Sequence, residues 1–257
     1  MVLLKMVPDV VEELEIADTG KALNPEASRM ILSETSDHAI EQALLLKEKY
    51  GGQITVISLD APEVDDALFT ALAKGADRAV KLAVDQTSMG TTTAARVFAS
   101  FFGPGPDAIT PDTLVVTGSQ AIDDLDGELA PSVAEILSLP FTGVVTSLTI
   151  EDGGKKLVAI KEFSGGLRGE YELNLPAVMG IQAAEKPPRY VPVAKVRNAM
   201  KTVKIEVREA VAPEGAEMVS IERMYKPETA GGAEMLEGTP EEVARRIAEI
   251  MAEKGLL

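Results

Sequence analysis

The stretch ITVISLDAPEVDDALFTALAKGADRAVKL, residues 54–82, decides the fold. It begins with a short apolar run at Ile54–Leu59, continues with helically spaced apolar residues over Val64–Lys74, and returns to an apolar run at Ala79–Leu82. Gly75 stands where the helical pattern stops, which is typical of a helix C-terminus. A strand, a helix and a second strand in this order predict two neighbouring parallel strands.

The same alternation continues on both sides of this stretch. Further buried strands are predicted at Val2–Val7 and Thr113–Thr117, and helices at 36–50, 91–102 and 128–137. Helices that connect parallel strands pack on both faces of the sheet. The fold class is therefore α/β, with a doubly wound, mostly parallel sheet.

After Pro140 the pattern changes to short strands without helices between them. Turn residues such as Gly153-Gly154 and Gly165-Gly166 separate four apolar segments. These segments are Val144–Ile150, Leu157–Phe163, Tyr171–Leu175 and Val178–Ile181. We expect them to add antiparallel strands to the sheet.

The C-terminal part of the chain contains many prolines and lacks regular periodicity until its end. We therefore expect an α/β domain over residues 1–185 and an extended arm over 186–257. The arm ends in a helix, because Thr239 can cap it, Pro240 suits its first position and Glu242 completes a capping box. One helix cannot bury its own apolar stripe, so the arm is expected to grip another surface.

The composition excludes several classes of function. There are 41 acidic and 25 basic residues, and the net charge of −16 opposes binding to nucleic acid and to anionic membranes. The chain has no cysteine, so disulfides, thiolate metal sites and cysteine nucleophiles are excluded, and its one histidine, His38, leaves little basis for a catalytic triad or a zinc site. Acids within the first 20 residues, and no apolar run of membrane length, predict a cytoplasmic protein.

Ligands of doubly wound sheets bind beyond the carboxyl ends of the strands. Four loops are expected at that edge: Val7–Val10, Leu59–Pro62, Val84–Thr93 and Gly118–Glu128. None of them contains GxGxxG or GxxxxGK[ST], so a standard dinucleotide fingerprint and a P-loop are both missing. A phosphate site at this edge would be of another kind.

Three polar segments each have two interpretations. The run from Asp123 to Glu128 carries four acids in six residues, and is either a solvated helix cap or a backbone-amide nest for phosphate with its acids turned outward. Gly90–Thr93 opens a helix at the same edge and is either a cap or a phosphate contact. Residues 186–204 carry six bases and no acid, and form either a solvated loop or a docking segment.

Five motifs occur in order along the chain: AIEQALLLKEKYG at Ala39–Gly51, ALAKGAD at Ala71–Asp77, QAIDD at Gln120–Asp124, LPAV at Leu175–Val178, and PPRY at Pro187–Tyr190, the last followed by Ala199-Met200-Lys201. Together they resemble the β subunit of electron transfer flavoproteins. The resemblance extends over essentially the whole chain. No single motif would suffice, but their shared order is specific.

The resemblance implies an electron carrier subunit rather than an enzyme in its own right. Such a β subunit forms a heterodimer with an α subunit that holds most of an FAD, and it relays electrons between dehydrogenases, often acyl-CoA dehydrogenases, and a downstream acceptor. Its fold is Rossmann-like and binds an adenine nucleotide, and it carries a docking loop and a C-terminal arm. The β subunit's own nucleotide is AMP in simple carriers and a second FAD in bifurcating ones, and both alternatives stay open here.

The resemblance also implies a set of cofactor-binding residues at the carboxyl edge. They are Met6, Val7, Pro8, Asp9, Ser33, Ser58, Leu59, Asp60, Gly90, Thr93, Gly118, Gln120, Ala121, Asp123, Asp126, Gly127, Glu128 and Leu129. Typical members hold phosphate with an Asn-Gln-Thr or Ala-Gln-Val run where this chain has Gly127-Glu128-Leu129, and a glutamate there repels phosphate unless it points away. Of the DRxFxGxDT-like loop of bifurcating members, this chain keeps only Asp85, Gly90 and Thr93.

Partner-docking residues are implied in the basic segment. They are Arg189, Tyr190, Val193, Lys195, Val196 and Met200. Val193 stands where the family places an aliphatic anchor for the dehydrogenase, commonly Leu. The smaller side chain buries less apolar area, and each methylene that is missing lowers the binding free energy by roughly 0.8 kcal/mol. A different preferred dehydrogenase is therefore expected to be possible.

Two other functions share this sheet topology. A stand-alone adenine-nucleotide-binding module of the universal-stress type should lack both the arm and the PPRY segment. An ATP-pyrophosphatase-type ligase needs an SGGxDS-like loop after the first strand, where this chain has Met6–Asp9. The sequence therefore favours the electron carrier over both.

Overall fold

The computed structural model describes residues 1–124, 127–213, 219–227, 233 and 235–256. Contacts within the chain divide it into two compact units, Met1–Glu222 and Arg223–Leu257. The first unit contains both sheets and five of the helices described below, and the second contains one helix. Each unit is described by itself.

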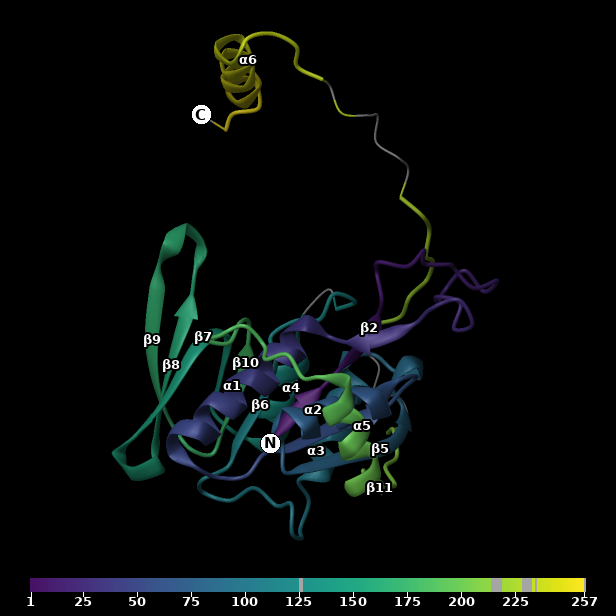
Figure 1. Cartoon of the computed structure of the whole chain (residues 1–257), viewed down its shortest axis with the longest axis vertical. Helices are drawn as coiled ribbons and strands as arrows, with labels where there is room; N and C mark the ends of the chain where they lie inside the picture. The colour runs from purple at the N-terminus through teal and green to yellow at the C-terminus, as the bar shows by residue number, and fades with distance from the viewer. Residues whose placement is uncertain (125–126, 214–218, 228–232, 234, 257) are drawn as a thin grey trace. The chain divides into compact units, whose positions relative to one another are not determined.

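The first unit is built on a nine-stranded sheet in the order β11-β5-β4-β1-β6-β10-β7-β8-β9 (Figure 1). Its strands are β1 Val2–Leu4, β4 Thr55–Asp60, β5 Arg78–Asp85, β6 Leu114–Gly118, β7 Phe141–Glu151, β8 Lys156–Glu162, β9 Arg168–Asn174, β10 Ala177–Ile181 and β11 Glu206–Arg208. Neighbours from β11 to β7 are parallel, and β7, β8 and β9 pair antiparallel. A separate antiparallel pair joins β2, Met6–Pro8, to β3, Met30–Leu32. The predicted doubly wound, mostly parallel α/β class is confirmed.

Helices cover both faces of the parallel strands. They are α1 Glu34–Tyr50, α2 Val64–Lys74, α3 Thr91–Phe101, α4 Leu129–Leu137 and α5 Val193–Thr202, with short 3₁₀ turns η1 Gln86–Ser88, η2 Asp152–Gly154 and η3 Ser164–Gly166. Side chains alternate along β1, so Val2 and Leu4 join one core with α1 and α2, while Leu3 joins the other with α3 and α4. Burial on both faces explains why these strands read as continuous apolar runs.

Strand β10 corrects the antiparallel expectation for Val178–Ile181. It pairs parallel with both β6 and β7 and lies between them. All five of its residues are buried, as expected of a central strand in a parallel sheet. The apolar pattern showed the strand but carried no information on its direction, because direction depends on how the preceding hairpin returns the chain to the sheet.

The expectation of an extended arm directly after residue 185 is corrected in one respect. Residues 193–202 form helix α5, which contacts α2, and residues 206–208 form β11, which extends the sheet by pairing with β5. Only Ala199 of α5 is buried, although Val193, Val196 and Met200 recur at helical spacing, and this short pattern after a proline-rich stretch was not recognised in the sequence. The boundary between compact units falls after Glu222. The functional division at residue 185 stays a prediction.

The second unit contains helix α6, Pro240–Glu253, and the predicted start of this helix is confirmed. Thr239 Oγ1 accepts a hydrogen bond from the Glu242 amide at 3.4 Å, and the Glu242 carboxylate accepts one from the Thr239 amide at 2.8 Å. This reciprocal pair is a capping box. Neither α6 nor any other helix in the described part of the chain is long and apolar enough to cross a membrane.

Candidate functional site

The carboxyl edge of the parallel strands is organised around Lys5, which directly follows β1. Its ammonium group forms ion pairs with Asp123, at 2.8 Å, and with Asp124, both from the loop after β6. The side chain of Asp124 is only 5% exposed. Asp124 fits neither interpretation of the acidic loop, because its carboxylate is buried and ion-paired and is therefore neither a solvated cap nor an acid turned outward. Asp126, also expected at the site, lies outside the described residues.

Asp124 also joins the loop after β6 to the start of α3. Its carboxylate accepts a hydrogen bond from Thr91 Oγ1 at 3.4 Å and one from the Ala121 amide at 3.3 Å. The Gln120 side chain donates to the Asp124 carbonyl at 3.1 Å. The structure thus brings Gln120, Ala121 and Asp123, three residues of the implied site, into one bonded loop.

The loop after β5 reaches the end of the first strand through Gln86. The Gln86 amide group donates to the Met6 carbonyl at 2.7 Å and accepts from the Met6 backbone amide at 3.1 Å. Both bonds are buried. Asp85 closes the turn behind Gln86 by accepting from the Thr87 amide at 2.9 Å. Gln86 therefore fixes Met6 in place.

Thr93 lies in the first turn of α3 at this edge. Its side-chain oxygen is buried, and among the described residues it has no hydrogen-bond partner. A buried hydroxyl without a partner costs free energy, so a ligand atom that bonds to it would recover that cost. The helix N-terminus also directs backbone amides toward the same edge, which suits an anion.

The start of α1 contacts the end of β6 and the loop that follows it. Thr35 Oγ1 donates to the Gln120 carbonyl at 2.8 Å and lies 3.2 Å from the hydroxyl of Ser33. A Cβ on Gly118 would lie 2.2 Å from Thr35 Oγ1, so only glycine fits at the end of this strand. Ser33 and Gly118 are therefore at the edge as expected.

Several expected cofactor residues have side chains that face the protein interior. Met6, Val7, Leu59 and Leu129 belong to the buried core, and Ser58 is fully buried, with its hydroxyl 3.3 Å from the Leu4 carbonyl. These residues could contact a ligand only through their backbone. The expected contacts are thus main-chain contacts.

Other expected residues lie on the rim of this edge. Asp9 accepts a hydrogen bond from the Val11 amide at 3.1 Å, beside Pro8, and Asp60 lies 3.6 Å from Lys81 Nζ. Gly127 has φ of +64°, and a Cβ on it would lie 3.0 Å from the Ser119 carbonyl. Glycine at 127 is therefore required by both conformation and space. Gly90 and Glu128 directly precede α3 and α4.

The implied docking residues gather on and before α5. Tyr190 is 83% exposed, Val193 59% and Met200 40%. Lys195 is exposed and Val196 half-buried. Arg189 differs from the others, because its guanidinium is held by two glutamates of α1.

The sequence analysis missed Lys5, Thr35, Gln86 and Glu41. Lys5 had a detectable signal, a single base within the apolar run VLLKMV. The other three lie on helices or turns and resemble ordinary surface positions. Their partners are distant in sequence, so only the fold brings them together.

A comparison with family models gives a match to the electron transfer flavoprotein domain over residues 22–214. The chain belongs to this family. Among curated relatives, the electron transfer flavoprotein subunit beta of Methylophilus methylotrophus is 32% identical, over 98% of this chain and 97% of the relative. That of Syntrophomonas wolfei is 30% identical, over 98% and 94%. CarD, a subunit of the caffeyl-CoA reductase-Etf complex of Acetobacterium woodii, is 28% identical over 100% and 99%.

These matches confirm the resemblance seen in the motifs. An electron transfer flavoprotein β subunit is an electron transfer subunit and not a catalyst by itself. The family match therefore favours the electron transfer flavoprotein β subunit over the alternative function, a stand-alone nucleotide-binding module of the universal-stress type. The architecture described above is thus that of a β subunit.

Proposed function

We propose that this β subunit pairs with an electron transfer flavoprotein α subunit and relays electrons from a dehydrogenase to a downstream acceptor. FAD, shared with the α subunit, supplies the redox chemistry, and the protein supplies binding and orientation. The single observation that carries the proposal is the family match over most of the chain. We also propose that the protein acts in the cytoplasm.

The donor dehydrogenase is proposed to act on a CoA thioester, as acyl-CoA dehydrogenases do. The support is indirect: a relative over the full length is a subunit of a complex named for caffeyl-CoA reductase. The proposed contact with the donor is the exposed surface of α5, where Val193 would be the apolar anchor.

The β subunit is further proposed to bind an adenine nucleotide at its carboxyl edge, either AMP or a second FAD that would allow bifurcation. The buried hydroxyl of Thr93, which has no partner among the described residues, fits a phosphate held by main-chain and hydroxyl groups, as do the start of α3 and the glycines at 118 and 127. Lys5 offsets one of the two negative charges of Asp123 and Asp124, so these acids oppose an anion less than two free carboxylates would. Thr93 and the amides around Gly127 are the proposed phosphate contacts.

Denaturing extraction of the co-purified two-subunit complex, followed by chromatography, tests these proposals. One FAD and one AMP per complex would support a simple carrier, and two FAD would support a bifurcating one. One FAD without any second nucleotide would overturn the nucleotide site. A chain that co-purifies with no flavin-containing subunit would overturn the pairing itself.

A further inference from the structure

The chain between β10 and α5 is bound along one face of α1. Three side chains within little more than one turn of α1 accept hydrogen bonds from three backbone amides of this segment. The bonds join Ala184 N to His38 Nδ1 at 3.1 Å, Glu185 N to Gln42 Oε1 at 3.2 Å and Arg189 N to Glu41 Oε2 at 3.0 Å. The segment that leads into α5 is therefore fixed on the α/β unit.

Arg189 adds an ion pair to these backbone bonds. Its guanidinium contacts Glu41 at 2.8 Å and Glu48 at 2.6 Å. The Glu41 side chain is 3% exposed, so the inner pair is shielded from solvent, whereas Glu48 is mostly exposed. A guanidinium that binds a buried carboxylate through two nitrogens has one defined position. We call Arg189 with Glu41 and Glu48 the first clamp.

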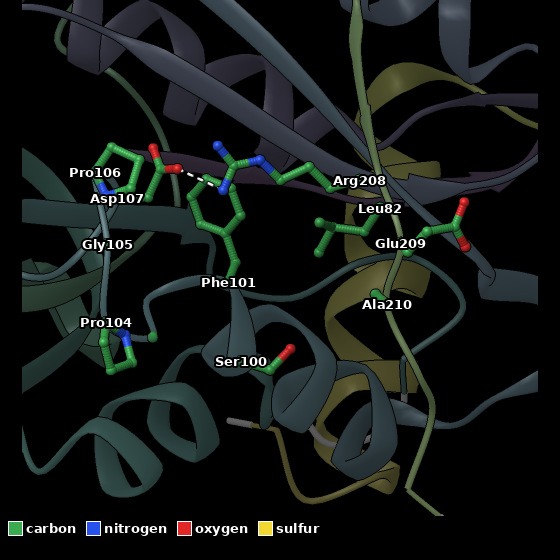
Figure 2. Close-up of a pocket in the computed structure, with 11 residues that line it drawn as sticks. Leu82, Ser100, Phe101, Pro104, Gly105, Pro106, Asp107, Arg208, Glu209 and Ala210 are labelled. Atoms are coloured by element: carbon green, nitrogen blue, oxygen red, sulfur yellow. Dashed lines mark ion pairs between the residues drawn. The ribbon is translucent and has the colours of Figure 1, made fainter.

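A second cluster of charges holds the chain just after α5. Arg78 on β5 pairs with Glu206 at 2.7 Å and with Asp107, and Arg208 pairs with the same Asp107 at 2.6 Å. Figure 2 shows the Arg208 guanidinium directed at Asp107 beside the ring of Phe101, whose centroid is 5.2 Å away. Asp107 is 3% exposed. We call these four charged residues the second clamp.

The second clamp borders the cavity shown in Figure 2. It has a volume of about 210 Å³ and lies between the end of α3, the turn at 103–107 and residues 208–210. Two of the three charged residues that line it, Asp107 and Arg208, are paired in the second clamp, and the third is Glu209. The cavity therefore marks where the β11 segment is fastened to the α/β unit.

Apart from the clamps, helix α5 is held by its contact with α2. It has 10 residues, of which only Ala199 is buried, and a helix of this length is marginal on its own in water. The first clamp ends four positions before Val193, and the second begins four positions after Thr202. Each end of α5 thus has a clamp beside it, in addition to the contact of its body with α2.

We infer that the two clamps preorganise α5 as a rigid docking platform, with Arg189 and Arg208 as positioning residues that act through α5. The inference rests on the proposed function, in which α5 contacts the dehydrogenase. If a loosened clamp leaves only a fraction of molecules with α5 in place, the apparent affinity for the dehydrogenase falls by that fraction. The electron transfer step after docking is unchanged.

The test uses the two-subunit complex with Glu41→Gln in the first clamp and Asp107→Asn in the second. Hydrogen exchange of the α5 amides should rise on the order of tenfold in each variant. The KM for the complex as electron acceptor of its dehydrogenase should rise several-fold, with kcat unchanged. Arg189→Lys keeps the charge but loses the two-nitrogen contact, so it should give an intermediate KM.

Glu172→Gln is the matched control, because it removes an ion pair with Lys156 at the opposite edge of the sheet. It should leave α5 exchange and KM unchanged. Unchanged α5 exchange in both clamp variants, or raised exchange with unchanged KM, would overturn the inference.

Val193→Asp separates this inference from the proposed function. It changes the contact surface without touching either clamp, so KM should rise while α5 exchange stays at the wild-type level. If Val193→Asp leaves KM unchanged, α5 is not the docking surface and the proposed function fails at that point. Raised exchange in the clamp variants would then show only that the clamps order α5.

Discussion

Glu41 is a buried carboxylate whose pKa is lowered mainly by Arg189 and less by the charge of Lys74. Burial alone would raise the pKa of Glu41, but the hydrogen bonds and charge of Arg189 outweigh it and hold the pKa below its ordinary value. Hydrogen bonds to Glu41, and then to Glu48, raise the pKa of Arg189. Because the folded-state pKa of Glu41 is the lower one, the unfolded chain takes up this proton first as the pH falls. The stabilisation is complete above the ordinary carboxylate pKa of about 4.3, and is lost as the pH falls through the folded-state value.

Glu41→Gln should therefore destabilise the protein in a pH-dependent way. At pH 7 we expect the free energy of unfolding to fall by about 2–4 kcal/mol, because Arg189 loses its buried partner and keeps only Glu48. Below the ordinary carboxylate pKa the difference from wild type should shrink. Urea unfolding at a series of pH values measures it, and a difference that stays constant down to pH 3 would contradict the assignment of Glu41.

Thr93→Val should have opposite effects on stability and on nucleotide binding. Valine has nearly the same shape and removes a buried hydroxyl without a partner, so the nucleotide-free protein should melt at the same temperature or higher. If the hydroxyl holds a phosphate oxygen, the affinity for the nucleotide should fall about tenfold, the value of one hydrogen bond. Differential scanning calorimetry and isothermal titration measure the two effects.

The neighbouring Thr92→Val is the control for this experiment. Thr92 lies in the same first turn of α3 but is not fully buried. It should change neither quantity by as much. Equal nucleotide affinity in wild type and Thr93→Val would show that Thr93 has a structural role only.

Strand β10 and helix α5 differ in burial: the strand is buried in the core, whereas the helix is mostly exposed. Strand β10 is buried along its whole length and lies at the centre of the sheet. Helix α5 buries one residue and exposes Val193 and Met200. Exposed apolar side chains on an element that hardly contributes to the core are typical of a binding surface.

Val193→Asp tests that surface at the level of the helix. A charge at this exposed position should change the melting temperature little, since the side chain has little buried area to lose. Reduction of the complex by its dehydrogenase should slow by at least tenfold at low protein concentration, with the flavin content unchanged. Flavin absorbance per protein gives the second reading, and a loss of flavin would place Val193 at the cofactor rather than at the partner.

The whole molecule has two compact units of unequal size, and the smaller one cannot bury its own helix. Helix α6 has 14 residues and exposes Ile247 and Met251. A capping box fixes its start, but a cap contributes only about 1 kcal/mol. Its stability as a helix therefore depends on packing against something else.

We predict that α6 is protected from hydrogen exchange only when the α subunit is bound. In the purified chain alone, the amides of residues 240–253 should exchange nearly as fast as in an unfolded peptide, whereas in the two-subunit complex they should be slowed on the order of a hundredfold or more. The amides of β10 serve as an internal control, since they should be protected in both samples. Strong protection of α6 in the lone chain would contradict a role of this unit in gripping the partner.

The local pattern of apolar residues was sufficient to predict most helices and strands. Apolar runs and helical spacing depend only on neighbouring residues. The predicted bounds of α2 agree with the structure, those of β4 are displaced by one residue, and β5 extends beyond the predicted strand at both ends. The α6 capping box is equally local and was predicted in full. Helix α5 was missed although Val193, Val196 and Met200 recur at helical spacing, because this pattern is short and follows a proline-rich stretch.

The sequence by itself determined the α/β alternation, the excluded chemistries and, through the order of its motifs, the family. The tertiary structure alone decided the parallel direction of β10, the neutralisation of Asp124 by Lys5 and the capture of Arg189 by Glu41. These last features join residues far apart in the chain. The physical reason is that an ion pair or a strand pairing depends on which segments the fold brings into contact. The residues adjacent in sequence do not determine this.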